Sequence, residues 1–397
     1  MNSPHEISHK VEKRELHALF FLFGFGIMAW VPRFPELKEN LNLTAGAFGA
    51  ILTTGSIGAF LGLLTAGSIV HKIGVHKVGI ASTLILFGSF AAIVHIRTPL
   101  YFIFVHIAIG YGITAMHVAF NTQGFHVQER SGEIVVTSTA GYWSAGALAT
   151  AVLSGFMVKR VGLALHIGVI SLACAIALVV VLNHLRPVLV QPNEHPENEY
   201  RMRDIFKSFH IDWPLSLPLA GAIYLEFAIG DWGTLFTKER LDIDSGLSAI
   251  PYIIFTLFMI FGRLTVQKIL HRFHISQVAR FSLLLAGLSF IALISIATHL
   301  PPSAKWFSYA LFLLAFATAG LGSAILGPSY TSAANRRSPH PSAVVVGQLG
   351  VVNNLLTTSL KWIVAGVVAA TGSIALALMI PAVLMIAASF FTDVLKD

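Results

Sequence analysis

The run GLALHIGVISLACAIALVVVLNH, residues 162–184, decides the fold class of this chain. It holds 23 consecutive residues without a single Asp, Glu, Lys or Arg. A helix that crosses the hydrocarbon core of a bilayer needs about 20 predominantly apolar residues. We therefore expect this run to be a membrane-spanning helix, and much of the remaining chain has the same character.

The composition of the whole chain fits lipid better than water. Of 397 residues, 55% are hydrophobic and only 11% are Asp, Glu, Lys or Arg, whereas a soluble domain carries about 25% charged residues. The sequence predicts an all-α membrane protein with twelve transmembrane helices. The predicted helices cover residues 16–36, 45–70, 78–96, 98–124, 135–158, 162–184, 214–236, 246–267, 276–299, 306–328, 342–368 and 373–392.

An internal repeat divides these helices into two bundles of six, residues 1–185 and 213–397. The polar, Pro-interrupted segment 186–212 is the predicted linker between them. A shift of 200 residues relates Gly62, Leu64, His71 and Lys72 to Gly262, Leu264, His271 and Arg272, and Gly110 and Gly112 resemble Gly320 and Gly322. Two parallel six-helix repeats with a solute site between them fit this pattern.

The Lys and Arg residues predict the orientation of the chain in its membrane. With the N-terminus inside, 17 of the 26 lie in cytoplasmic segments and 8 on the opposite side, with Lys361 inside a helix. Such an excess marks the cytoplasmic side, so both termini and the linker are expected there. Met1–Glu15 precedes the first apolar run, which no small-residue cleavage site follows, so we interpret that run as a retained helix. The basic residues form no patch interleaved with aromatics, which argues against nucleic-acid binding.

The segment GSIVHKIGVHK, residues 67–77, resembles the motif that joins helices 2 and 3 in the major facilitator superfamily. Gly67, Ile69, Lys72 and Gly74 fit that motif, but His71 stands where an aspartate is usual and Val75 where an arginine is usual.

A second resemblance is to the YbjJ-type inner-membrane permeases of bacteria, which are distant relatives of the fucose permease. It rests on the segments AWVPRFP (29–35), HVAFNTQG (117–124), GYWSAG (141–146), EFAIGDW (226–232), FTLFMIFGR (255–263) and GLGSAILGP (320–328). The resemblance implies a multi-pass transporter of the bacterial inner membrane that moves a small solute with protons.

Polar side chains inside a bilayer are costly and mark candidate sites. In the run 98–124, helical spacing places His106, His117 and Asn121 on one face. His117 stands where relatives carry Glu or Asp, which implies a role in proton movement for a side chain that titrates near neutrality. The alternative for both histidines is a neutral ring that is hydrogen-bonded between helices.

The run 214–236 carries two acids. Glu226 falls near mid-membrane and is a candidate proton site, whereas Asp231 lies about 140° around the helix and closer to the outer end. With Trp232, Asp231 forms either an interfacial cap or a substrate contact.

The run 342–368 carries the candidate binding residues Gln348, Asn353, Asn354 and Lys361. Lys361 either meets Glu226, binds an anionic solute, or extends towards the membrane surface.

Three further residues are candidates for contact with the solute. Arg33 is either a gate or substrate cation, or the partner of Glu36 or Asp231. Tyr142 and Trp143 either stack on a sugar or base ring or pack between helices.

Gly24 and Gly26 are expected to permit close helix packing.

The sequence thus predicts a secondary active transporter of a small polar solute (a sugar, sugar derivative or nucleoside-like molecule), which works by alternating access with protons. A proton-antiport efflux pump for drugs or metabolites is the alternative within the same fold. A polytopic membrane enzyme or a non-transporting receptor is the alternative from another class. We expect a monomer in contact with membrane lipids, without cofactor, catalytic cluster or metal site, since the 17 histidines lack ligand spacing.

Overall fold

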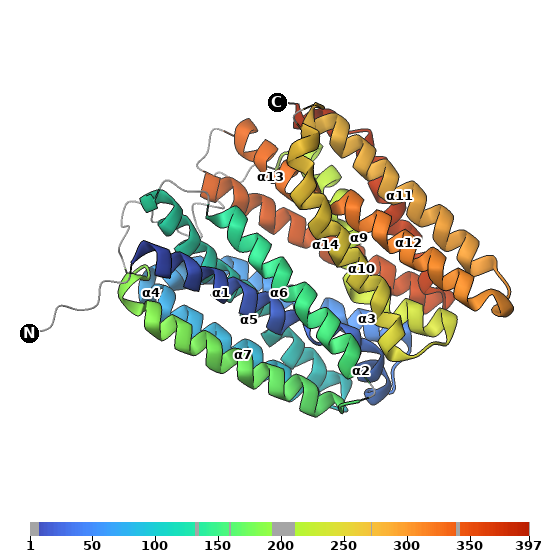
Figure 1. The fold of residues 1–397 in the computed structure, drawn as a ribbon, viewed down its shortest axis with the longest axis horizontal. Helices are drawn as coiled ribbons and strands as arrows, with labels where there is room; N and C mark the ends of the chain where they lie inside the picture. The colour runs from blue at the N-terminus through green and yellow to red at the C-terminus, as the bar shows by residue number, and fades with distance from the viewer. Residues whose placement is uncertain are drawn as a thin grey trace, which may run out of the picture. The chain divides into compact units, whose positions relative to one another are not determined.

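The computed structural model describes residues 8–131, 135–158, 160–192, 211–270, 272–338 and 342–396. Within these ranges the chain is helical and contains no β-strand (Figure 1). The fold divides into two compact units. Unit 1 comprises Met1–Trp30, Thr54–Ser154 and Val161–Lys207, and unit 2 comprises Val31–Thr53, Gly155–Arg160 and Ser208–Asp397. Most of the predicted linker, residues 193–210, lies outside the described residues.

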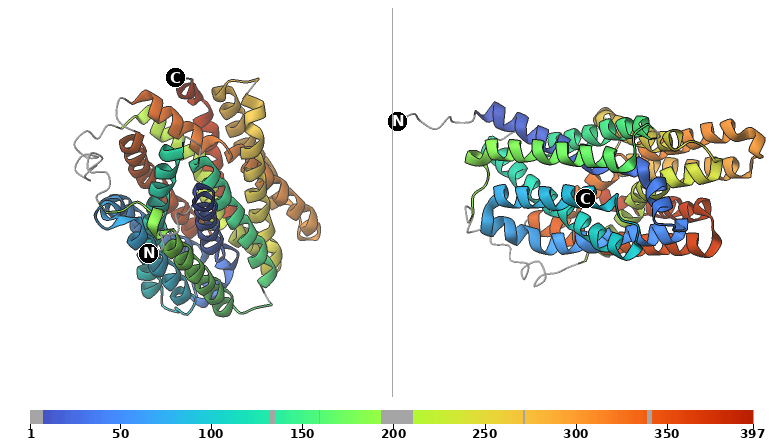
Figure 2. Two further views of the ribbon diagram at one scale, coloured as in Figure 1. Left: turned by 60° about the vertical axis from the view of Figure 1, so that its left-hand side comes forward. Right: turned by 90° about the horizontal axis from the view of Figure 1, so that it is seen from below.

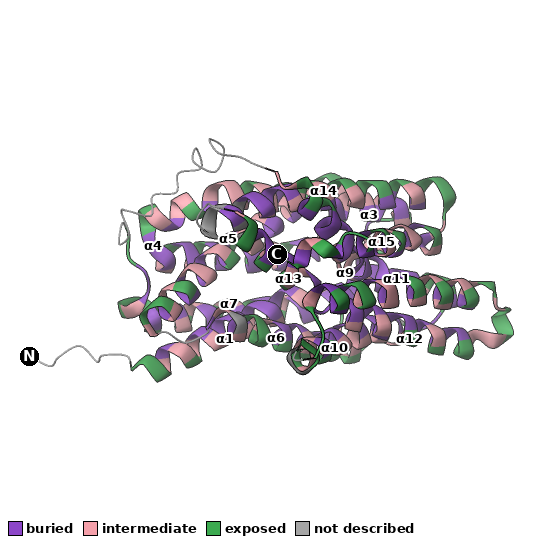
Figure 3. Cartoon of the chain, turned by 90° about the horizontal axis from the view of Figure 1, so that it is seen from above, coloured by how far each residue is buried: buried purple, intermediate pink, exposed green. Residues whose placement is uncertain are grey.

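Unit 1 is built from long apolar helices. They are α1 (His9–Met28), α4 (Gly55–Ile93), α5 (Pro99–Ser131), α6 (Val136–Met157, whose last residues belong to unit 2) and α7 (Leu163–Leu185), followed by the 3-10 turn η2 (Arg186–Val188). The helix α7 exposes a stripe of large aliphatic side chains at intervals of three and four residues: Leu165, Val169, Leu172, Ile176 and Val180. Figure 3 shows buried, intermediate and exposed residues interspersed along the helices. A stripe of this kind suits lipid contact.

Unit 2 contains the remaining elements. They are η1 (Val31–Arg33), α2 (Phe34–Asn40), α3 (Ala45–Thr53), α9 (Trp213–Leu241), α10 (Ser245–Leu270), α11 (Ile275–His299), η4 (Pro302–Ala304), α12 (Lys305–Ser323), α13 (Leu326–Arg337), α14 (Ser342–Thr371), α15 (Ile374–Ser389) and η5 (Thr392–Leu395). The helix α11 packs against α12 and α15, and both views of Figure 2 place α11 beside α12.

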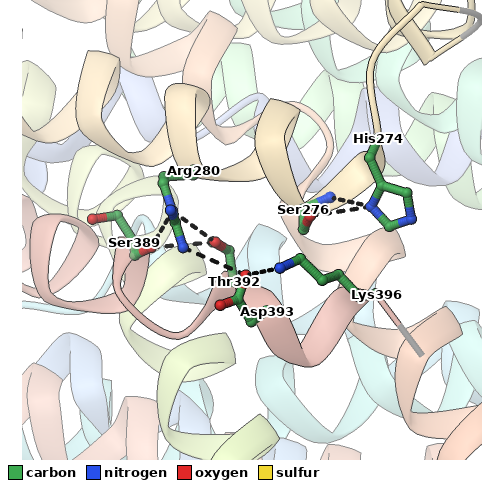
Figure 4. Close-up of polar contacts among 7 residues, drawn as sticks. All are labelled: His274, Ser276, Arg280, Ser389, Thr392, Asp393 and Lys396. Carbon is green, nitrogen blue, oxygen red and sulfur yellow. Dashed lines mark hydrogen bonds and ion pairs between the residues drawn. The ribbon is translucent and has the colours of Figure 1, made fainter.

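Polar contacts fasten the C-terminal turn η5 to the first turns of α11. The Arg280 guanidinium donates hydrogen bonds to the Ser389 carbonyl and the Thr392 hydroxyl, each at 3.3 Å (Figure 4). It also lies 3.5 Å from Asp393, which Lys396 contacts at 2.8 Å.

Helices differ from the sequence prediction where prolines or glycines interrupt the backbone. The predicted helix 16–36 is broken after α1, because Pro32 and Pro35 cannot donate backbone hydrogen bonds. The helix predicted at 45–70 corresponds to α3 and the first part of α4, and the helix predicted at 78–96 to the second part of α4, with a non-helical backbone at Gly74 between the two parts. At Gly74 (φ 82°, ψ 161°) α4 kinks sharply, a backbone conformation that glycine adopts without a steric penalty. The predicted helix 306–328 is divided into α12 and α13.

Glycines bring helices into backbone contact at matching places in the two units. A Cβ on Gly110 would lie 1.9 Å from the Gly55 carbonyl oxygen, and one on Gly320 would lie 2.1 Å from the Phe255 carbonyl oxygen. Gly62 likewise meets Thr114, and Gly262 meets Ala324. The α4–α5 contact of unit 1 therefore recurs between α10 and α12 of unit 2, at glycines that the sequence repeat relates.

Nine helical stretches among the described residues are long and apolar enough to cross a membrane. One of them, Ala45–Ile93, covers two of the predicted helices because it runs across the kink at Gly74. The predictions at 135–158 and 373–392 correspond to α6 and α15, which are not among the nine.

Candidate functional site

An ion pair joins α9 and α14 within unit 2. Asp231 Oδ2 lies 2.7 Å from Lys361 Nζ, and the two side chains are 23% and 17% exposed. The same ammonium group lies 5.7 Å from the ring centroid of Phe227, one helical turn before Asp231. A cation over an aromatic face at this distance is attracted by the ring, so Lys361 is held between a carboxylate and an aromatic ring.

Glu226 does not take part in this pair. The five-residue step from Glu226 to Asp231 turns the helix through about 140°, and Lys361 contacts the second acid. Glu226 is partly buried and forms no ion pair with any described residue. The structure thus gives Lys361 a partner that the sequence analysis had not considered.

The helix α14 also carries polar groups that lack partners. Asn353 and Asn354 are partly buried, and the side-chain oxygens of Asn353 and Thr358 accept or donate no hydrogen bond among the described residues. A buried polar atom without a partner is costly, and such an atom is suited to a hydroxyl-bearing ligand.

The candidate Gln348 lies elsewhere on α14. It is 6% exposed and lines a cavity of about 750 Å³ in unit 2, together with Trp213, Ser216 and the ion-paired residues Asp212 and Arg337.

Arg33 is buried and belongs to unit 2. It is 1% exposed, and its guanidinium lies 3.1 Å from Glu36. Of the two partners predicted for it, Glu36 is therefore the one observed, while Asp231 pairs with Lys361.

Trp232, which follows Asp231, is 2% exposed. Its ring packs so closely on α3 that a Cβ on Gly49 would lie 1.9 Å from Trp232 Cζ2. The Trp232 ring is thus packed between α9 and α3.

His106, in unit 1, is buried among aromatic rings. Its Nδ1 lies 3.3 Å from the Thr54 hydroxyl, and its ring centroid lies 5.5 Å from that of Trp30 and 5.8 Å from that of Phe102. This environment matches the alternative of a histidine that is hydrogen-bonded between helices.

His117 and Asn121 lie three and four turns further along α5 in a different environment. His117 is exposed, with its ring 5.9 Å from that of Phe23 on α1, and Asn121 is partly buried. The predicted stripe of polar residues is therefore buried at His106 and accessible at His117.

Tyr142 stacks on a histidine that the sequence analysis missed. The rings of Tyr142 and His17 are 4.2 Å apart and inclined by 12°, and His17 Nε2 lies 2.9 Å from the Ser138 hydroxyl. His17 stands in the first apolar run, and a polar residue there was the available signal. The backbone of the next residue, Trp143, lies against Gly24, where a Cβ would be 2.1 Å from the Trp143 oxygen.

A second cluster that the sequence analysis missed surrounds Gln123 of unit 1. Its amide donates to Glu12 Oε1 at 3.1 Å and to the Val188 carbonyl at 3.0 Å, and its oxygen accepts from Val190 N at 2.9 Å. Glu12 is 1% exposed and also pairs with Arg130. This network connects α1 and α5 with the segment after α7, which suggests a structural role.

Among the described residues, no group of three His, Cys, Asp or Glu side chains is arranged to hold a metal ion.

Comparisons with known proteins agree on one family. The family model of the Major Facilitator Superfamily matches residues 16–359. An uncharacterized MFS-type transporter of Yersinia pestis is 22% identical over 348 residues, which cover 87% of this chain and 85% of that protein. Membrane protein MosC of Rhizobium meliloti is 22% identical over 250 residues, covering 63% of this chain and 60% of MosC.

Two solved structures share the fold. The nucleoside transporter NupG superimposes with a TM-score of 0.74 at 15% identity, covering 97% of this chain and 99% of NupG. A D-xylose-proton symporter superimposes with a TM-score of 0.72 at 13% identity, covering 97% of each chain. At these identities the likeness concerns the fold alone.

Proposed function

Because this chain belongs to the Major Facilitator Superfamily and is therefore a multi-pass membrane transporter rather than an enzyme, we propose that it carries a sugar-like or nucleoside-like solute by proton-coupled alternating access. We place it in a bacterial inner membrane as a monomer with both termini in the cytoplasm. Twelve transmembrane helices in two six-helix repeats are part of the proposal, supported by the glycine contacts that recur in units 1 and 2.

The observation that carries this proposal is the Asp231–Lys361 pair beneath the Phe227 ring. Charged side chains within membrane helices are rare and mark solute or ion pathways. A carboxylate accepts hydrogen bonds from sugar hydroxyls, an ammonium group donates to ring or hydroxyl oxygens, and an aromatic face packs on a sugar or base ring. These three kinds of contact lie within one turn of α9 and its neighbour α14.

The polar groups of α14 extend this surface. Asn353 offers a buried carbonyl oxygen without a partner among the described residues, and Asn354 lies next to it. A solute with several hydroxyl groups would satisfy such atoms. The names of the two similar structures, a nucleoside transporter and a xylose-proton symporter, add support for this class of solute.

For proton coupling we propose Glu226 and His117. An ionised carboxylate near mid-membrane without a paired cation is costly, so loading with a proton would relieve Glu226. The His117 side chain is exposed, and an imidazole is a group that can bind and release a proton. Asp231 would exchange protons only when solute binding or a conformational change separates it from Lys361. His106 is the weakest candidate for proton coupling, because its ring is packed among aromatic side chains.

A panel of solutes in proteoliposomes tests the proposal. Monosaccharides, disaccharides, nucleosides and cationic dyes would be offered to the purified protein with a pH gradient imposed in either direction. We expect a sugar or nucleoside to accumulate on the side towards which protons flow. Accumulation of dyes against the proton flow would instead favour efflux by antiport. Absence of movement for every solute in both directions would favour a receptor.

A further inference from the structure

The cavity of about 750 Å³ in unit 2 lies where α9, α13 and α14 pack against one another. It is lined by the first residues of α9, the last turn of α13 and the beginning of α14. Small-molecule sites have volumes of about 300–1,000 Å³. Ser216 precedes Asp231 by 15 residues on α9, and Gln348 precedes Lys361 by 13 residues on α14. At about 1.5 Å per residue the cavity therefore lies about 20 Å along both helices from the Asp231–Lys361 pair.

Apolar side chains form much of the cavity lining. Val345, Leu349 and Val352 follow one another at intervals of four and three residues, so they share one face of α14. All three line the cavity and are less than 10% exposed, and Leu215 of α9 adds a fully buried side chain. Such a surface favours contact with the apolar body of a ligand over contact with water.

Two buried polar side chains interrupt this apolar lining. Gln348 is 6% exposed and Ser216 is 3% exposed, and both line the cavity. An amide and a hydroxyl can each donate and accept hydrogen bonds. A small number of polar groups placed among apolar ones is the usual composition of a site that orients a small molecule.

An ion pair gives the cavity both signs of charge. Asp212 directly precedes α9 and Arg337 ends α13, and both line the cavity. Arg337 Nε donates to Asp212 Oδ2 at 2.8 Å, and the two side chains are 30% and 29% exposed. A ligand with a single charge would meet a like charge at one of these side chains. A ligand with an ammonium group and an acidic group close together can instead bond to both, through charge-assisted hydrogen bonds.

We propose that this cavity is a second ligand site, which binds an amphipathic zwitterion: an ammonium group and an acidic group close together, attached to an apolar body. The ammonium group bonds to Asp212, the acidic group bonds to Arg337, and the apolar body packs on Leu349 and its neighbours on α14. Free α-amino acids with large apolar side chains have this chemistry, and so does phosphatidylethanolamine. The proposed sugar-like or nucleoside-like solute lacks such a pair of charges, so the two sites take different ligands.

Binding of radiolabelled phenylalanine to the purified full chain in detergent tests the chemistry of the site. Three competitors each lack one feature: phenethylamine has no carboxylate, 3-phenylpropionate has no ammonium group, and glycine has no apolar body. We expect saturable binding of phenylalanine, with each competitor at least about tenfold weaker than unlabelled phenylalanine, because charge-assisted hydrogen bonds and apolar contacts are each lost in turn. Equal competition by all three would overturn the proposal.

A substitution that fills the cavity tests its location. Leu349→Trp adds a large side chain to the lining and should lower phenylalanine binding by more than about 100-fold. Leu355→Trp is the matched control, since it makes the same change on the same helix at a side chain that is 52% exposed. It should retain binding. Phenylalanine binding that is unchanged in a folded Leu349→Trp variant would place the ligand elsewhere and overturn the proposal.

A second variant keeps the test informative if Leu349→Trp fails to fold. Asp212→Asn combined with Arg337→Gln removes both charges and leaves neither uncompensated, so folded yield should persist while affinity falls by at least about tenfold. The matched control is Asp393→Asn combined with Arg280→Gln, which removes another exposed ion pair of unit 2 and should retain binding. Equal affinities in these two double variants would overturn the proposal.

Lipid nanodiscs distinguish the two sources of the zwitterion. Phosphatidylcholine is the reference lipid, because its trimethylammonium group has no N–H to donate to Asp212. Displacement of phenylalanine when phosphatidylethanolamine is added would assign the site to the lipid, and unchanged binding would assign it to a free amino acid. If phenylalanine does not bind and native mass spectrometry finds no phosphatidylethanolamine retained, the proposal is wrong. None of these measurements uses transport, so their failure leaves the proposed transporter function untouched.

Discussion

Two ion-paired regions of unit 2 have similar chemistry and different surroundings. Asp231–Lys361 joins α9 and α14 within predicted membrane spans, at 2.7 Å and with side chains 23% and 17% exposed. Arg280–Asp393 fastens α11 to η5 beyond the end of the last span, at 3.5 Å and with side chains 49% and 60% exposed. The second region also has hydrogen bonds to Ser389 and Thr392 (Figure 4).

The difference in surroundings gives different expectations for the two pairs. A pair at a helix end adds to contacts that already hold the chain, and water screens it. A pair inside a membrane protein gains little over apolar side chains of similar size, because desolvation offsets its attraction. Stability alone therefore does not explain Asp231 and Lys361. If the two pairs differ in role, substitutions at Asp231 and Lys361 will abolish transport, whereas substitutions at Arg280 and Asp393 will not.

The largest effect is expected from removing one charge of the Asp231–Lys361 pair. Asp231→Asn or Lys361→Met leaves the other charge uncompensated, which costs about 3–5 kcal/mol. We expect both folded yield and solute uptake to fall, uptake by more than about 100-fold. Yield is measured by size-exclusion chromatography and uptake in proteoliposomes.

The double variant with both substitutions separates the two roles of the pair. It restores neutrality, so the folded yield should recover while uptake stays lost. If uptake recovers together with yield, the Asp231–Lys361 pair is structural and does not differ in role from Arg280–Asp393.

The next effect concerns Glu226, which precedes Asp231 by five residues on α9 and does not join the ion pair. Glu226→Gln mimics a protonated side chain, so solute exchange by counterflow should continue while accumulation driven by a pH gradient is abolished. His117→Ala should flatten the pH dependence of transport near neutrality. Both assays are run side by side with the solute that the panel identifies. Wild-type accumulation and pH dependence in both variants would remove these residues from proton coupling.

Packing rather than charge is expected to hold each unit together. Gly110→Ala and Gly320→Ala place a methyl group about 2 Å from a carbonyl oxygen of the neighbouring helix. Such overpacking costs typically about 1–3 kcal/mol, and both variants should lower the Tm of the detergent-solubilised protein by similar amounts.

Matched controls for these variants lie on α7 and α14. Gly168→Ala and Gly366→Ala introduce the same methyl group where no atom lies within 4 Å. They should leave the Tm unchanged or slightly raised, because alanine favours the helix. Equal losses of Tm at contact and control positions would contradict the role assigned to the glycine contacts.

The sequence predicted the all-helical fold, because long apolar runs are local signals, and it singled out Asp231 and Lys361 as separate candidates, because charged residues stand out in such runs. It did not predict the partner of Lys361, since pairing depends on how α9 and α14 are rotated and offset against each other. The break expected between residues 70 and 78 is found as the non-helical backbone of Gly74 within α4. His17 was missed because nothing local shows that Tyr142 stacks on it.

The smallest effect is expected from the Arg280–Asp393 pair. A hydrogen bond from Lys396, followed by the charges of Lys396 and Arg280, lowers the pKa of Asp393 below its usual value of 3.8. A carboxyl group whose pKa is lower in the folded state stabilises that state above pH 3.8, and this contribution disappears as the pH falls through the lower folded pKa. Asp393→Asn should therefore lower Tm slightly at pH 7, and the difference from wild type should shrink as the pH falls below 3.8. Thermal unfolding at pH 7 and at a pH below 3.8 measures this difference in Tm. Uptake by Asp393→Asn at pH 7 is expected to equal that of wild type. A Tm difference independent of pH would assign the effect to the amide rather than to the lost charge, and lost uptake would place Asp393 with Asp231.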